Sequence, residues 1–166
     1  FFFDDIENYK YKTWNQVMSV NLGGMFLFAQ KIGKSMIKYR KGGSIIQISS
    51  LYGLVAPDYK IYKGIKDKSV SHSPISYMVS KSALEGLTKY LSAHWGKYNI
   101  RVNSVCPGGI DIGLDSTFKK NYINKVPLNR MATVHDLAGI ILYLSSDTSS
   151  YVTGQNFVID GGYTII

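Results

Sequence analysis

A phenol and an ammonium group stand four residues apart in this sequence, at Tyr77 and Lys81. In a helix this spacing places both side chains on one face, one turn apart. A neighbouring ammonium favours the phenolate form of a tyrosine, which makes proton exchange at neutral pH easier. The pair therefore suits acid–base chemistry on an alcohol or a carbonyl group, although a chance pair on a surface helix has the same spacing.

Three further polar residues lie where they could assist this chemistry. Ser49 and Ser50 follow an apolar stretch that predicts a buried strand, and α/β proteins place functional groups at such strand ends. A hydroxyl there could bind a substrate oxygen, or the serines could simply end the strand. Asn21 lies inside a long helical pattern, where asparagine is a poor helix former. It could be a buried amide, a surface residue, or the holder of a water molecule that bridges to Lys81.

The elements that would position these residues alternate along the chain. Apolar residues every three or four positions predict a helix over about residues 13–39, and Pro74 opens another that reaches Trp95, with Ser73 as its cap. Apolar runs rich in β-branched residues predict buried strands at 44–49, 100–106 and 155–160. Thr133 and Asp136 resemble a capping box before a helix at 134–144. This alternation predicts an α/β fold with a parallel sheet.

Composition excludes several classes of protein. With 166 residues, 45% of them hydrophobic and 18% charged, the chain fits one globular domain, residues 1–166. A single cysteine, Cys106, excludes an internal disulfide, and the separated histidines show no metal-ligand spacing, so we expect no metal. No apolar run is long enough for a membrane span, so we expect a cytoplasmic protein. The net charge of +8 is dispersed and without a nucleic-acid-binding motif, which makes nucleic acid the weaker alternative to a solvated surface.

Five stretches together resemble the short-chain dehydrogenase/reductase family, in the order in which that family carries them. They are residues 14–24, 46–53, 77–88, 100–109 and 151–163. The resemblance implies a three-layer, Rossmann-like, doubly wound parallel sheet, of which this chain would be the C-terminal part. It also implies an oxidoreductase that interconverts a secondary alcohol and a carbonyl with NAD or NADP, because hydride transfer belongs to that cofactor.

The same resemblance implies roles for individual residues. Tyr77 would exchange the proton with the reacting oxygen, and Lys81 would stabilise its phenolate and bind the nicotinamide ribose. Ser50 would orient the substrate oxygen, and Asn21 would support a water-linked proton relay through Lys81. The cofactor-binding residues implied are Tyr77, Lys81, Pro107, Gly108, Gly109 and Ile110. Helices that carry Asn21 and Tyr77 form subunit contacts in the family, which implies a homodimer or homotetramer with a small-molecule substrate.

The sequence departs from the family pattern at its beginning. No glycine-rich turn for a pyrophosphate precedes Thr13. Three βα units of roughly 30 residues would supply it, so we expect about 90 residues to be missing. The alternative is an inactive truncated fragment that serves only as a binding or oligomerisation module. Ile112 also stands where many relatives carry a threonine that contacts the carboxamide of the nicotinamide.

A long excursion at residues 51–76 separates the serine from the tyrosine. It is either a surface excursion or a lid over the substrate, because long loops are often binding elements. Residues 57–62 resemble a subset of these reductases found near flagellin-modification and surface-sugar genes. Together with four lysines in this excursion, this favours a sugar, a sugar acid or a nucleotide sugar as the substrate.

Overall fold

The computed structural model describes residues 3–65 and 72–166. Within them, the strands β1 (Gly43–Ile48), β2 (Ile100–Pro107) and β3 (Asn156–Ile159) form a sheet in the order β1-β2-β3. Both pairings are parallel, with Gly43 opposite Ile100 and Ser104 opposite Asn156. The three predicted strands and the parallel sheet are therefore confirmed.

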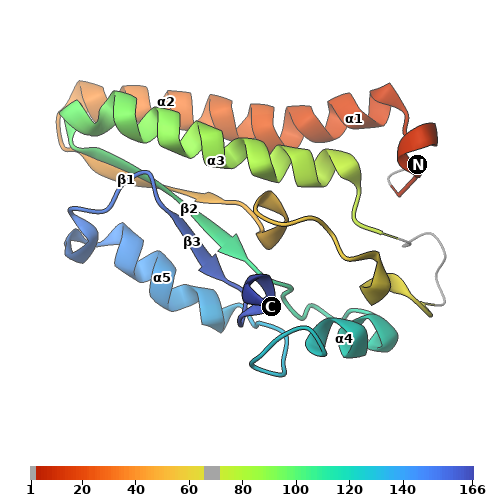
Figure 1. The fold of residues 1–166 in the computed structure, drawn as a ribbon. Helices are drawn as coiled ribbons and strands as arrows, with labels where there is room; N and C mark the ends of the chain where they lie inside the picture. The colour runs from red at the N-terminus through yellow and green to blue at the C-terminus, as the bar shows by residue number, and fades with distance from the viewer. Residues whose placement is uncertain (1–2, 66–71) are drawn as a thin grey trace.

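Helices cover both faces of this sheet (Figure 1). One layer contains α1 (Tyr11–Met18), α2 (Met25–Tyr39) and α3 (Ile75–Trp95), and the opposite face carries α5 (His135–Ser145). A further helix, α4 (Ser116–Ile123), lies beyond the C-terminal ends of the strands. Short 3-10 segments occur at Ile6–Asn8, Leu51–Gly53, Tyr59–Tyr62, Gly96–Tyr98, Asp147–Ser149 and Tyr163–Ile165. The predicted three-layer α/β architecture is confirmed.

The main core lies between the paired helices and the sheet. Ala29 of α2, Leu91 and Trp95 of α3, and Ile100 and Val102 of β2 form one buried cluster. These residues come from the apolar faces that the sequence pattern predicts, since burying one stripe of a helix against a sheet is the main source of stability for such a layer.

The apolar spacing predicts one continuous helix over about residues 13–39, but the structure interrupts this helix. A π-helical segment, Ser19–Gly24, separates α1 from α2 and contains Asn21. Gly23 and Gly24 are weak helix formers, which makes the regular hydrogen-bond pattern easier to interrupt here. Such π turns occur frequently at functional sites.

One predicted cap is wrong, and a second forms only in part. Pro74, which lacks an N–H, is the N-cap of α3 without a side-chain cap, and Ser73 is buried beside it. Only half of the capping box forms: Asp136 Oδ2 accepts the backbone N–H of Thr133 at 2.7 Å, while Val134 is the N-cap of α5. Helix α4 was not predicted at all. In the described part of the chain, no helix is long and apolar enough to cross a bilayer.

Candidate functional site

Tyr77 and Lys81 lie side by side on the first turns of α3. The Lys81 Nζ atom is 5.6 Å from the centre of the Tyr77 ring, as their spacing along a helix predicts. Lys81 Nζ also donates a hydrogen bond of 2.8 Å to the carbonyl oxygen of Ile48, the last residue of β1. The ammonium is thus held between the helix and the end of the strand, next to the phenol.

The environment of Lys81 affects its charge. Burial lowers the pKa of its ammonium below the ordinary value, and the nearby Cys106 thiol opposes this shift. Apart from the bond to Ile48, no described residue accepts an N–H of Lys81 Nζ. Two of its three donors therefore remain for a ligand.

The two serines at the end of β1 have different partners. Ser49 Oγ donates to the carbonyl oxygen of Lys81 at 3.0 Å, so its proton is used to tie the strand to α3. Ser50 Oγ instead accepts the backbone N–H of Tyr52 at 3.2 Å, and no described residue accepts its proton. Ser50 is therefore the serine whose hydroxyl can still donate to a substrate oxygen, which supports its choice from the resemblance.

Asn21 contacts α3 through a residue that the sequence reasoning missed. Its Nδ2 donates to Ser80 Oγ at 3.1 Å, and Ser80 Oγ donates to the carbonyl oxygen of Tyr77 at 2.7 Å. Ser80 is completely buried. The amide of Asn21 thus holds the turn that carries Tyr77 and Lys81, while a water-linked relay to Lys81 stays a prediction.

A cavity of about 440 Å³ lies beside Tyr77. Besides Tyr77, its lining includes the rings of Tyr52, Tyr62 and Phe118 together with Ser73 and Asp115. Burial raises the pKa of both Tyr52 and Tyr62 above the ordinary value for a phenol, so both remain neutral. The excursion at 51–76 therefore supplies part of the wall next to Tyr77, although its residues 66–71 lie outside the described residues.

Asp115 and Phe118 also line this cavity, and they come from a segment whose sequence signal was present but short. Asp115 is a favourable N-cap residue, and Phe118 and Tyr122 follow at a spacing that puts both on one face of a helix. These residues belong to α4, whose eight residues are too few for a clear periodic pattern.

The predicted cofactor-binding run starts at Pro107, the last residue of β2, and continues through Gly108, Gly109 and Ile110. It lies at the same edge of the sheet as Ser50, because β1 and β2 are parallel and end together. Gly109 N–H donates to Tyr122 Oη at 2.5 Å, and burial raises the pKa of this phenol to about 12.

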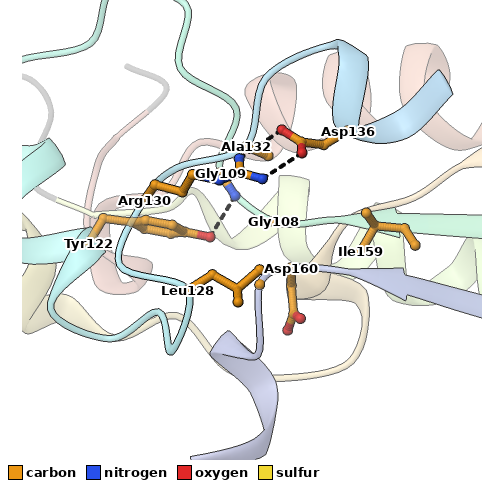
Figure 2. A pocket seen from close by; sticks show the side chains of 10 residues that line it. Gly108, Gly109, Tyr122, Leu128, Arg130, Ala132, Asp136, Ile159 and Asp160 are labelled. Carbon is orange, nitrogen blue, oxygen red and sulfur yellow. Dashed lines mark hydrogen bonds and ion pairs between the residues drawn. The ribbon is translucent and has the colours of Figure 1, made fainter. Parts of the chain in front are cut away.

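A second, smaller cavity of about 120 Å³ lies against the two glycines (Figure 2). On one side, Arg130 reaches Asp136 through two hydrogen bonds of 2.6 and 2.8 Å. The carboxylate of Asp160 accepts the backbone N–H groups of Gly162 and Thr164. The charged side chains of this smaller cavity are thus paired with one another or with the backbone. The smaller cavity is therefore a poorer substrate site than the cavity beside Tyr77.

Comparison with known proteins decides the family. The family model described as enoyl-(acyl carrier protein) reductase matches residues 2–73 and 65–164. The chain is 36% identical over 165 residues to a D-arabinitol 2-dehydrogenase (ribulose-forming) of Candida tropicalis, covering 95% of this chain and 54% of that protein. The chain belongs to the short-chain dehydrogenase/reductase family. It spans about half the length of the curated relatives it matches.

Solved structures of this family share the fold. A short-chain dehydrogenase from Leptospira borgpetersenii with bound NAD⁺ superimposes with a TM-score of 0.89 at 40% identity, covering 98% of this chain and 60% of that one. A gluconate 5-dehydrogenase from Burkholderia cenocepacia in complex with NADP and tartrate gives a TM-score of 0.85 at 28% identity, with 98% and 60% covered. The Rossmann-like fold class is thereby confirmed.

The residues of this chain fit the nicotinamide end of such a dinucleotide. The two spare N–H donors of Lys81 can serve ribose hydroxyls, and they lie between Tyr77 and the exposed end of β1. In the described residues, no group of three or more histidine, cysteine or acidic side chains is placed to hold a metal ion.

Proposed function

We propose that the natural protein carrying this chain is an NAD(P)-dependent oxidoreductase that interconverts a secondary alcohol and a carbonyl. The observation that carries this proposal is the position of Tyr77, between the ammonium of Lys81 and a cavity large enough for a small substrate. The family membership supports it, since the relatives described above are dehydrogenases.

The residues of the chain account for the proton and for substrate orientation. When bound, the nicotinamide supplies or accepts the hydride at the substrate carbon. Tyr77 takes the proton from the alcohol oxygen in oxidation and returns it in reduction, with Lys81 stabilising the phenolate. Ser50 donates a hydrogen bond from its hydroxyl to the same substrate oxygen and keeps its proton. The Ser80 hydroxyl, held by Asn21, keeps the first turns of α3 in place.

For the substrate, we propose a sugar, a sugar acid or a nucleotide sugar. The relatives named for arabinitol and gluconate support a polyol or sugar-derived substrate. The resemblance of residues 57–62 to reductases of flagellin and surface-sugar modification supports the same class. Tyr52 and Tyr62, from the excursion at 51–76, then act as substrate-binding residues.

We also propose self-association as a homodimer or homotetramer. Phe26, Leu27 and Phe28 are exposed on α2, and Tyr90 is exposed on α3. Apolar side chains gathered on the same helical layer favour burial against a second copy.

The test is the variant Tyr77→Phe in the whole natural protein. It removes only the hydroxyl, so we expect kcat to fall by about 100-fold or more while the Kd for NAD(P) changes little. Tyr143→Phe is the matched control, because Tyr143 lies partly exposed on α5, on the opposite face of the sheet and outside the cavity. Equal activity of Tyr77→Phe and the control would remove Tyr77 from the acid–base role. Absence of any NAD(P)-linked turnover in the wild type would favour a fragment that only binds.

A further inference from the structure

The cavity beside Tyr77 is apolar except at one side. Tyr62 and Phe118 form a continuous aromatic wall, with ring centres 5.4 Å apart and planes tilted by 51°. Faces of aromatic rings pack well against the C–H groups of a carbon skeleton and carry no formal charge. The wall therefore accommodates the carbon chain or ring of a substrate, whereas recognition of its substituents depends on the polar groups at the rim.

The charged group at this rim is Asp115. Its Oδ1 accepts the backbone N–H groups of Thr117 at 2.8 Å and Phe118 at 3.0 Å, which fixes the carboxylate at the start of α4. No described residue donates a hydrogen bond to its Oδ2. The carboxylate thus has a free acceptor oxygen in the lining of the cavity.

Other carboxylates next to α4 are neutralised, and Asp115 is not. Asp111 pairs with Lys119 at 2.8 Å, and Asp58 pairs with Lys125. Asp115 forms no ion pair with a described residue. Among the described residues that line the cavity, Asp115 is the charged one. Asp115 therefore contributes an unpaired negative charge to this side of the cavity.

We propose that this cavity selects uncharged, hydroxyl-bearing substrates and rejects carboxylates and phosphates, with Asp115 as the specificity-determining residue. This inference rests on the proposed function and narrows its substrate class: of sugars, sugar acids and nucleotide sugars, it keeps the neutral polyols and unmodified sugars and excludes the two anionic classes. The free Oδ2 accepts a hydrogen bond from a substrate hydroxyl, and the same charge repels an anionic group. The Asp115 carboxylate itself offers no hydrogen-bond donor to a substrate anion, which adds to the electrostatic cause of rejection.

The experiment compares sorbitol with gluconate, which have the same carbon chain and differ in charge. The ratio of kcat/KM for sorbitol to that for gluconate is measured in the whole natural protein, the variant Asp115→Asn and a control. Asparagine caps a helix about as well as aspartate, so Asp115→Asn removes the charge and keeps α4. We expect the wild type to prefer sorbitol, and the variant to lower the ratio about tenfold through faster turnover of gluconate.

The control is Asp147→Asn, which changes the net charge equally. Asp147 is exposed in the segment after α5 and does not line the cavity. We expect the sorbitol-to-gluconate ratio of kcat/KM in Asp147→Asn to match that of the wild type. A ratio that shifts equally in both variants would mean a general charge effect and would overturn the role of Asp115.

Binding keeps this test separate from that of the proposed function. The Kd values of sorbitol and gluconate, measured calorimetrically, give the selectivity of binding without turnover. An inactive protein that still prefers sorbitol, with the preference lost in Asp115→Asn, would refute the proposed function and support the cavity selectivity. An active enzyme that prefers gluconate, or whose ratio is unchanged in Asp115→Asn, would overturn the selectivity and leave the proposed function intact.

Discussion

Gly33 of α2 packs directly against Trp95 of α3, and replacing this glycine tests the core. A Cβ added at Gly33 would lie 2.4 Å from Cη2 and 2.5 Å from Cζ2 of Trp95 on α3. Carbon atoms in contact are normally about 3.5–4.0 Å apart, so the ring or the helix must shift by about 1 Å. Trp95 is only 7% exposed and packs in the main core, so its ring has no open space to enter.

The net effect of Gly33→Ala combines two opposing contributions. Overpacking a core costs about 1–3 kcal/mol, and this contact is at the severe end of that range. Alanine is a better helix former than glycine by about 1 kcal/mol, which offsets part of the cost. We therefore expect the free energy of unfolding to fall by about 1–2 kcal/mol.

Gly86→Ala is the matched control for this substitution. Gly86 lies on α3 with no heavy atom within 4 Å of its added Cβ, so only the helix propensity changes. We expect Gly86→Ala to raise the free energy of unfolding by up to about 1 kcal/mol. Urea denaturation with equal m values measures both changes. The packing argument is refuted if Gly33→Ala proves as stable as Gly86→Ala.

Three further predictions concern charge and reactivity. Arg130 and the N–H of Thr133 hold the pKa of Asp136 well below its usual range, so this carboxylate stabilises the folded state at neutral pH and loses that effect as the pH falls below about 4. The variant Arg130→Met should therefore show a smaller acid-induced drop in Tm than the wild type, and an equal drop would contradict the pairing. Burial raises the pKa of Cys106 to about 11. At pH 8 the folded protein should react with a thiol reagent at least about 100-fold more slowly than the unfolded chain. Lys81→Met should lower kcat and weaken NAD(P) binding together, and unchanged cofactor affinity would separate Lys81 from the cofactor.

The strands and long helices were predictable because each is specified locally. β1 and β2 both contain β-branched residues, β2 is almost entirely buried while β1 buries Ile45 and Gln47, and the bounds of both strands lie within about two residues of the prediction. Helix α4 was missed for a physical reason. Its eight residues are mostly polar, and isolated helices of that length are unstable in water. It forms because Phe118 and Tyr122 pack against the aromatic cluster that includes Tyr163, a long-range contact that no local pattern reveals.

The sequence could predict which site residues lie close together, but it could not predict which group accepts the hydrogen bond of each serine hydroxyl. Tyr77 and Lys81 share one helix, so their separation follows from helical geometry alone. Ser49 and Ser50 are adjacent at a strand end, and either could serve a substrate by position. Only the structure shows that the Ser49 hydroxyl is committed to the Lys81 carbonyl oxygen. The contact of Asn21 with Ser80 likewise depends on the π-helical segment, which the apolar spacing did not predict.

Reaction type and substrate choice therefore depend on the sequence in different ways. The acid–base pair is held by one turn of α3, so a fixed spacing predicts it wherever the chain folds as a helix. The cavity is lined by residues that include Tyr52, Tyr62 and Asp115. Loops separate these residues along the chain, so their spacing in the sequence does not fix their distances in space. A change from aspartate to asparagine at position 115 would leave every motif of the family intact and would still alter the charge that a substrate meets. Motifs of fixed spacing thus predict the reaction type that we propose, whereas the packing of α4 against the excursion at 51–76 shapes the cavity on which the proposed substrate choice depends.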